Sequence, residues 1–261
     1  MSPVFIGGAP RSGTTLLRAM LGAHPHIFCP PEFRTTATIA RLWEGLEQAC
    51  GADLRGGYGL DGQDLRRAFA DLLIELLTPA WRASGKARLA EKTPANVLVF
   101  PALLRLFPSC RLIEVVRDPR DVVASRFVAD ARTERGPRGA QAQAMIWAAS
   151  VEAGGRARRD APDRVRRIRY ERLVTAPETE MRALLAFLGE DWSPAVLEHH
   201  RSLGEEPKAI NEWSADQVRR PVNTDSIGRW RQVLTKAEAE AVMEIAGAKA
   251  GQWDEALDDA A

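Results

Sequence analysis

Glycine, arginine and hydroxyl side chains gather near the start of the chain, in an order that suits a phosphate group. Residues 8–15 read Gly-Ala-Pro-Arg-Ser-Gly-Thr-Thr and follow the apolar run 4–6. A glycine turn between a strand and a helix directs backbone N–H groups and the helix N-terminus towards an anion. A helix N-cap with a tight turn is the plainer alternative. The residues expected to hold the anion are Arg11, Ser12, Gly13, Thr14 and Thr15.

The same segment differs from a nucleoside-triphosphate loop at one position. Its spacing resembles G-x-x-x-x-G-K-[ST], but Thr14 stands where that loop has its lysine. Without the lysine, the β- and γ-phosphates lose their usual cation. We therefore expect a shorter anion on the 5′ side of a nucleotide, and an ATP-dependent kinase becomes the less favoured alternative.

Residues 5–21, followed by Ala23-His24-Pro25, resemble the 5′-phosphosulfate loop of the sulfotransferases that use 3′-phosphoadenosine 5′-phosphosulfate (PAPS). Within that superfamily the segment is most similar to the tyrosylprotein sulfotransferases. The resemblance runs with gaps from Val4 to Trp230. It implies in-line transfer of a sulfuryl group from PAPS to an acceptor hydroxyl, which leaves adenosine 3′,5′-bisphosphate (PAP). It also implies a P-loop-like three-layer α/β fold with a central parallel sheet flanked by helices, and a 5′-phosphosulfate loop at 7–15.

A second anion site, a 3′-phosphate motif, is expected at residues 112–125. Arg117 follows the apolar start of this segment, at the carboxyl end of a predicted strand, where ligands of α/β sheets gather. Ser125 can face the same pocket from the next helix. In sulfotransferases a matching arginine and serine hold the 3′-phosphate, and a guanidinium fork fits phosphate geometry. A surface arginine paired with Asp118 or Asp121 is the alternative.

Two anion sites on one nucleotide distinguish PAPS from ATP, and this favours a sulfotransferase over a kinase. One position departs from the family pattern. The tyrosylprotein sulfotransferases have a further arginine four residues after the motif serine, and here that residue is Ala129. Arg126 and Arg132 are the candidates to replace it.

The resemblance also identifies candidate catalytic residues. Glu32 matches the catalytic glutamate of the family, and a carboxylate base suits an alcohol or phenol when burial raises its pKa. Lys92 resembles the lysine that stabilises charge at the bridging oxygen, as a fixed cation that requires no metal. A solvated loop glutamate and a surface lysine are the alternatives. Glu91 is expected to hold Lys92, and Arg34 to reach an acceptor carboxylate or the active-site glutamate.

Residues 213–229 form the expected nucleotide-closing loop, which resembles a stretch that covers the nucleotide in tyrosylprotein sulfotransferases. Ser214 matches a serine that helps to stabilise the transition state and completes the catalytic set with Glu32, Lys92 and Arg11. An irregular polar surface loop is the alternative. The residues of this loop expected at the nucleotide are Ser214, Gln217, Val218, Arg219, Arg220, Pro221, Val222, Asn223 and Arg229.

Tyrosine and histidine side chains each allow a functional and a structural interpretation. Tyr170 matches a tyrosine near the nucleotide, and the alternative is a strand-end aromatic residue that packs in the core. Cytosolic small-molecule sulfotransferases often use a histidine base. His24 belongs to a helix-end pattern and is interpreted as structural, and His199 and His200 have no motif support.

These residues require an alternating series of strands and helices, and such alternation favours a parallel sheet in one domain over 1–261. The predicted strands are 4–6, 88–90, 112–116 and 165–170. The predicted helices are 14–21, 36–49, 63–81, 119–127, 141–156, 177–188 and 236–248. The predicted loops are 51–62, 130–139 and 201–225. Helices 36–49 and 63–81 are expected to shape the acceptor cleft.

Composition narrows the class of protein. The chain has 261 residues, 45% hydrophobic and 27% charged, which allows a sizeable core. The formal net charge of +1 disfavours nucleic acid as a partner. Three cysteines are too few for a disulfide scaffold, no Cys or His pair has zinc spacing, and no metal is expected. With no signal peptide or membrane span recognised, the prediction is a cytoplasmic protein without a membrane partner.

The acceptor stays open at this point. The tyrosylprotein sulfotransferases suggest a tyrosine in a peptide, but those enzymes work in a secretory compartment. Cys29 matches a cysteine that is disulfide-bonded there, whereas its partner position is Ala90. A small-molecule alcohol, phenol or carbohydrate is an equal alternative. A homodimer is suggested by the family, and a non-catalytic nucleotide-binding protein is the alternative function.

Overall fold

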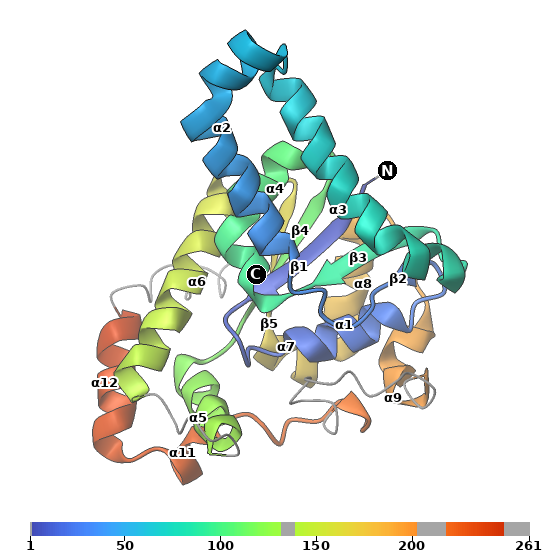
Figure 1. Ribbon diagram of the computed structural model, residues 1–261. Coiled ribbons are helices and arrows are strands. Elements are labelled where there is room, and N and C mark those ends of the chain that lie inside the picture. The colour runs from blue at the N-terminus through green and yellow to red at the C-terminus, as the bar shows by residue number, and fades with distance from the viewer. Residues whose placement is uncertain (1, 132–138, 203–217, 248–261) are drawn as a thin grey trace.

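The computed structural model describes residues 2–131, 139–202 and 218–247. Within them the chain forms a five-stranded parallel sheet in the order β2-β3-β1-β4-β5 (Figure 1). The strands are β1 (Val4–Gly8), β2 (Ile27–Phe28), β3 (Arg88–Lys92), β4 (Arg111–Val116) and β5 (Val165–Arg169). All four strands predicted from the sequence are confirmed. The fifth strand, β2, is absent from the prediction because its two residues are too few to show a hydrophobic pattern.

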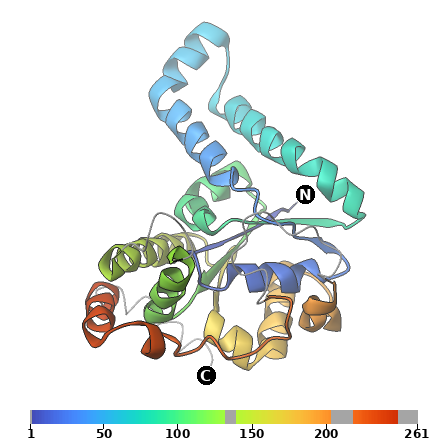
Figure 2. The same ribbon diagram turned by 60° about the horizontal axis from the view of Figure 1, so that its bottom comes forward.

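Helices cover both faces of the sheet, as the two views show (Figures 1 and 2). The β1 side chains alternate between them: Phe5 packs in one apolar cluster, and Val4 and Ile6 pack in the other. The first face carries η1 (Pro94–Val99), α4 (Phe100–Leu106) and α6 (Ala140–Asp160). The second carries α1 (Thr14–Gly22), α7 (Tyr170–Thr175) and α8 (Pro177–Leu188). The expected three-layer α/β architecture is therefore confirmed.

The remaining helices lie around the edges of these layers. Helix α5 (Pro119–Asp130) follows β4 and packs against α6, α11 (Trp230–Val233) and α12 (Lys236–Gly247). The turn η2 (Pro194–Glu198) and helix α9 (His199–Ser202) pack against α1. Strand β5 ends at Arg169, and Tyr170 begins α7 instead of ending the strand as predicted. None of the helices in the described ranges combines the length and apolar character needed to cross a membrane.

A long helical hairpin projects from one side of the sheet (Figure 2). It consists of α2 (Thr36–Tyr58) and α3 (Gly62–Ser84). The predicted loop at 51–62 is wrong because α2 continues through its glycines at a cost of about 1 kcal/mol each relative to alanine. The break comes at Gly59, which has a left-handed φ of 68°, and Asp61 then caps α3 through the N–H groups of Gln63 and Asp64.

Candidate functional site

A cavity of about 700 Å³ lies at the carboxyl ends of the strands, where α/β folds bind ligands. Its described walls come from the segments that follow β1, β2, β3 and β4, from Tyr170 at the start of α7, and from the chain between 218 and 232. Among the described residues, no lining residue of this cavity comes from α2 or α3, and the expectation that these helices shape the acceptor cleft stays a prediction. The predicted site residues in its walls are Arg11, Gly13, Thr14, Thr15, Glu32, Arg34, Arg117, Ser125, Tyr170, Val218, Arg220, Pro221, Val222, Asn223 and Arg229.

The loop after β1 is a tight cradle that only glycine permits at two positions. A Cβ on Gly8 would lie 2.3 Å from the Val115 carbonyl oxygen, and one on Gly13 would lie 2.3 Å from the Tyr170 ring. Gly13 has φ 98° and precedes α1 without a side-chain cap on its N-terminus. The Ser12 hydroxyl is buried and makes no hydrogen bond within the described residues. A buried orphan donor beside bare helix N–H groups fits a bound anion.

Glu32 and Lys92 meet at one end of the cavity. The Lys92 Nζ donates to Glu32 Oε1 at 2.7 Å and to the Thr15 hydroxyl at 3.2 Å. The Arg34 Nε donates to Glu32 Oε2 at 3.2 Å, which agrees with one of the two roles predicted for Arg34. The Lys92 side chain is fully buried and the Glu32 side chain is 17% exposed. A cation, a carboxylate and the cradle loop therefore meet at one point.

Glu91 does not hold Lys92 as the sequence suggested. Neighbouring residues of a strand point to opposite faces, so the two side chains leave β3 in opposite directions. Glu91 instead accepts hydrogen bonds from the side chains of Thr36, Thr93 and Asn96. Burial raises the pKa of the Glu91 carboxyl, and these hydrogen bonds lower it in part.

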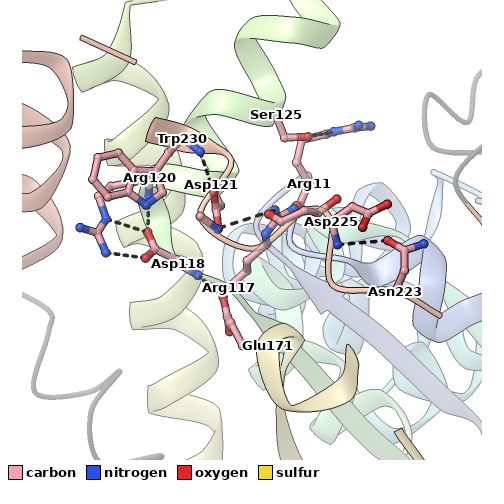
Figure 3. A network of polar contacts seen from close by, with 12 residues as sticks. Arg11, Arg117, Asp118, Arg120, Asp121, Ser125, Glu171, Asn223, Asp225 and Trp230 are labelled. Carbon is pink, nitrogen blue, oxygen red and sulfur yellow. Dashed lines mark hydrogen bonds and ion pairs between the residues drawn. The ribbon is translucent and has the colours of Figure 1, made fainter. Parts of the chain in front are cut away.

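Arg117 lies at the other end of the cavity and is 5% exposed, which excludes the alternative of a solvated surface arginine. Its guanidinium donates to the carbonyl oxygens of Arg11, at 3.3 Å, and Ser226 (Figure 3). It also stacks over the Tyr170 ring, with 4.4 Å between its central carbon and the ring centroid. The Arg11 Nε donates to the Ser125 hydroxyl at 3.0 Å, which joins the two predicted anion motifs.

Asp121 ties the late segment of the chain to this end (Figure 3). Its carboxylate accepts the backbone N–H groups of Gly228, at 2.8 Å, and Trp230, at 2.9 Å. Arg117 lies 3.8 Å from the same carboxylate, and the Trp230 ring packs under the Arg120 guanidinium. Asp121 is 1% exposed. The sequence offered Asp121 only as a partner of Arg117, and its main contacts lie more than a hundred residues away.

Several predicted residues fall elsewhere. Ser12 and Lys92 lie behind the cavity wall, and Arg219 is exposed and does not line it. Ser214 and Gln217 lie outside the described residues, so their contacts stay predictions. The sequence reasoning missed a group of lining residues that has no motif of its own: Pro10, Leu16, Thr93, Pro94, Ala95, Asp225, Ser226 and Gln232.

The open question at Ala129 receives a partial answer. Ala129 is buried in α5, whereas Arg126 lines the cavity beside Ser125. The Arg126 guanidinium lies 3.9 Å from Asp130, which is a distant pairing. Arg132 lies outside the described residues. Arg126 is therefore the described candidate for the missing cation.

His24 has the structural role predicted for it. Its Nε2 lies 2.9 Å from the Asp191 carbonyl oxygen, and its Nδ1 accepts the His26 N–H at 3.2 Å. Neither His24 nor the buried His199 lines the cavity. Cys29 is buried and forms no disulfide within the described residues.

Comparison with known proteins identifies the family. The model of the Sulfotransferase family matches residues 3–194. A protein-tyrosine sulfotransferase of Drosophila melanogaster is 33% identical over 237 residues, 88% of this chain and 47% of that protein. Protein-tyrosine sulfotransferase A of Caenorhabditis elegans is 31% identical over 87% of this chain and 60% of its own length. The chain thus spans about half to two thirds of these relatives.

Solved structures agree on the fold. The sulfotransferase domain of the Synechococcus PCC 7002 olefin synthase has a TM-score of 0.67 at 22% identity, over 96% of this chain and 94% of that one. A mouse sulfotransferase complexed with PAP has a TM-score of 0.60 at 16% identity, over 100% of this chain and 89% of that one. With the family model matching most of its length, this chain belongs to the sulfotransferase family.

Proposed function

We propose that this chain transfers a sulfuryl group from PAPS to an acceptor hydroxyl. The observation that carries the proposal is the pair formed by Glu32 and the buried Lys92, which meets the glycine cradle through Thr15. A base, a fixed cation and an anion loop then share one end of the cavity. Arg117 and Ser125 supply a second anion site at the other end. Two separated anion sites suit a nucleotide with charge at both its 5′ and 3′ positions.

The residues present fit such a donor. The N–H groups at the start of α1 and the cavity-lining hydroxyls of Thr14 and Thr15 would hold the 5′-phosphosulfate, with the buried orphan Ser12 hydroxyl beside them. Arg117, Ser125 and Arg126 would hold the 3′-phosphate, and Tyr170 would lie near the nucleotide. When bound, PAPS supplies a sulfuryl group whose bond to the bridging phosphate oxygen breaks as a bond from sulfur to the acceptor oxygen forms.

Glu32 acts in this proposal as the general base. Its Oε2 is fixed by Arg34, while its Oε1 contacts Lys92 in the free protein. Lys92 also reaches Thr15, so movement of the ammonium towards the cradle leaves Oε1 able to accept the hydroxyl proton. The positive charge of Lys92 then faces the side where negative charge develops.

The acceptor is proposed to be a peptide tyrosine or a small-molecule alcohol or phenol. The names of the curated relatives favour the tyrosine. The cavity wall beside Glu32 combines Leu16, Pro94 and Ala95 with the cationic Arg34, and an apolar ring with a polar attachment suits it. A cytoplasmic location, a single domain and a homodimer remain proposals beside this one.

Isothermal titration calorimetry with PAP, AMP and Mg-ATP tests the donor. We expect PAP to bind in the micromolar range and AMP, which lacks the 3′-phosphate, at least about 30-fold more weakly. Arg117→Ala should weaken PAP and leave AMP nearly unchanged. Ser125→Ala is the milder control, because it removes a hydroxyl without opening the buried Arg117 network. Equal binding of the three nucleotides, or a preference for Mg-ATP, would overturn the proposed donor.

Transfer itself is tested with radiolabelled PAPS and a panel of acceptors. The panel contains tyrosine peptides, small phenols and small alcohols. Label appearing in one class names the acceptor. If PAP binds tightly and no class is labelled at any enzyme concentration, the catalytic part of the proposal fails and a nucleotide-binding protein remains.

A further inference from the structure

A second carboxylate lies directly beside the proposed catalytic pair, and the proposed reaction does not use it. Glu91 precedes Lys92 on β3 and is fully buried. A buried carboxylate is costly unless its oxygens are hydrogen-bonded. Its surroundings therefore indicate what the fold gains from it.

The Glu91 carboxylate is fully hydrogen-bonded by neutral groups. The hydroxyls of Thr93, at 2.6 Å, and Thr36, at 2.9 Å, donate to it. The Asn96 side-chain amide donates at 2.6 Å, and the Phe33 backbone N–H also lowers the pKa of the carboxyl through a hydrogen bond. An ionised carboxylate accepts four such bonds, whereas a glutamine would turn an NH₂ group towards donors.

Two of these four contacts end on one short segment, residues 33–36, and a third reaches the same segment through Thr93. Phe33 and Thr36 bond to Glu91 directly. Arg34 is held through a relay: its backbone N–H donates to the Thr93 hydroxyl at 3.1 Å, and that hydroxyl donates to Glu91. The segment begins directly after Glu32 and ends at Thr36, the first residue of α2.

The backbone of this segment needs such support. Arg34 has a φ of 62°, in the left-handed region that non-glycine residues rarely adopt. Its side chain bonds to Glu32 Oε2, so the conformation of Arg34 sets the orientation of the proposed base. Loss of the Thr93 bond would release the residue that aligns Glu32 together with the backbone that carries it.

We propose that Glu91 is a positioning residue: through Thr93, Phe33 and Thr36 it fixes residues 32–36 so that Glu32 faces Lys92 and the acceptor hydroxyl. The inference rests on the proposed sulfuryl transfer for its effect on turnover. The geometric part, that Glu91 orders the segment, stands on the contacts alone.

Glu91→Gln tests the effect on turnover. We expect kcat for sulfuryl transfer to fall about 10- to 100-fold, because small displacements of a reacting group cost this much. The KM for PAPS and the affinity for PAP should change less than about threefold, since the Arg117 end is untouched. Thr93→Val should give a smaller loss of the same kind. The double variant should lose no more than Glu91→Gln, because both act through one relay.

Glu114→Gln is the matched control. Glu114 is another buried carboxylate, on β4, and it pairs with Arg167 away from the cavity. It should lower the melting temperature and leave kcat unchanged. If Glu91→Gln retains kcat, or lowers kcat and PAP affinity in parallel, the positioning role is wrong.

Hydrogen exchange decides the geometric part without any turnover. In Glu91→Gln, the amides of Phe33 and Arg34 should exchange faster, while those of residues 12–17 keep their wild-type rates. This readout holds even if the wild-type protein transfers no sulfuryl group, which would refute the proposed function alone. Unchanged exchange at Phe33 and Arg34 would overturn the inference.

Discussion

The two ends of the cavity are each organised by a buried carboxylate, and the two carboxylates work differently. Asp121 accepts hydrogen bonds directly from two backbone N–H groups of the late segment and faces the cation Arg117. Glu91 bonds to neutral groups and reaches the backbone of Arg34 through the Thr93 hydroxyl. One carboxylate therefore holds the surface proposed to bind the nucleotide, and the other is proposed to orient the reacting glutamate.

This difference predicts that one end of the cavity contributes to nucleotide affinity and the other to turnover. Changes around Asp121 should alter the affinity for the nucleotide, because the groups that it holds are proposed to touch the nucleotide. Changes around Glu32 and Glu91 should alter turnover at saturating nucleotide. Variants at the two ends should thus separate into KM effects and kcat effects.

The largest effect is expected for Glu32→Gln. The amide keeps the size of the side chain and cannot accept the acceptor proton, so kcat should fall about 10²- to 10⁴-fold. PAP affinity by calorimetry should stay within about twofold. Glu32→Asp, which retains a carboxylate on a shorter chain, should keep part of the activity. Full turnover in Glu32→Gln would mean that the base is another group and would break the comparison.

A smaller effect, on nucleotide affinity instead of turnover, is expected for Asp121→Asn. The amide replaces one acceptor oxygen with a donor that faces the N–H group of Gly228 or Trp230. We expect PAP affinity to fall about 10- to 30-fold, with kcat at saturating PAPS nearly unchanged. Asp118→Asn is the matched control, because asparagine caps α5 as well as aspartate does. A fall in kcat at unchanged PAP affinity would contradict this separation of affinity from turnover.

The sequence predicted the sheet and both anion motifs because these depend on local patterns. Strands β1 and β4 are apolar runs that end at their motifs, and Pro119 begins α5 where the sequence placed it. The predicted elements leave 94–106 out, and the structure has η1 and α4 there, with Pro94 and Pro101 near their starts. Both prolines lie in the first turn of η1 and α4, where their missing N–H groups cost nothing.

The roles of Glu91 and Asp121 could not be read in the same way. Thr36 lies 55 residues from Glu91, and Gly228 lies 107 residues from Asp121. A carboxylate beside a lysine suggests an ion pair, and only the alternation of β3 shows that Glu91 points away from Lys92. The motifs indicate which residues are proposed to react, whereas the long-range contacts show what holds those residues in place.

A change remote from both ends should affect stability alone. A Cβ on Gly154 would lie 2.2 Å from the carboxyl carbon of Glu114, and moving that carboxylate would disturb its buried ion pair with Arg167. Gly154→Ala should lower the free energy of unfolding by about 2 kcal/mol. Gly45→Ala, in α2 with no atom within 4 Å of its new Cβ, is the control and should be neutral or slightly stabilising. Altered kcat or PAP affinity in folded Gly154→Ala would show that the sheet transmits strain to the site.

The smallest effect is the pH dependence of stability, and its sign should differ between two buried groups, Glu91 and His199. Burial raises the pKa of Glu91. For this carboxyl the folded state therefore gains stability as the pH falls from its folded pKa towards its unfolded pKa. Burial and the charges of His200 and Arg18 lower the pKa of His199 to about 4, although a hydrogen bond with the Val218 backbone opposes this. His199 begins α9, which packs against α1, and does not line the cavity.

For His199 the unfolded chain binds the proton more tightly, so stability is lost as pH falls from about 6.5 towards 4. Between about pH 7 and about pH 5.5 this loss is about 1 kcal/mol. The loss should be absent in His199→Gln, so denaturant unfolding at both pH values should show wild type and variant converging in acid. His26→Gln, at a largely exposed histidine, is the control and should follow the wild type. Parallel curves for wild type and His199→Gln would mean that His199 takes up its proton equally in the folded and unfolded states, so that folding does not lower the pKa of its imidazole.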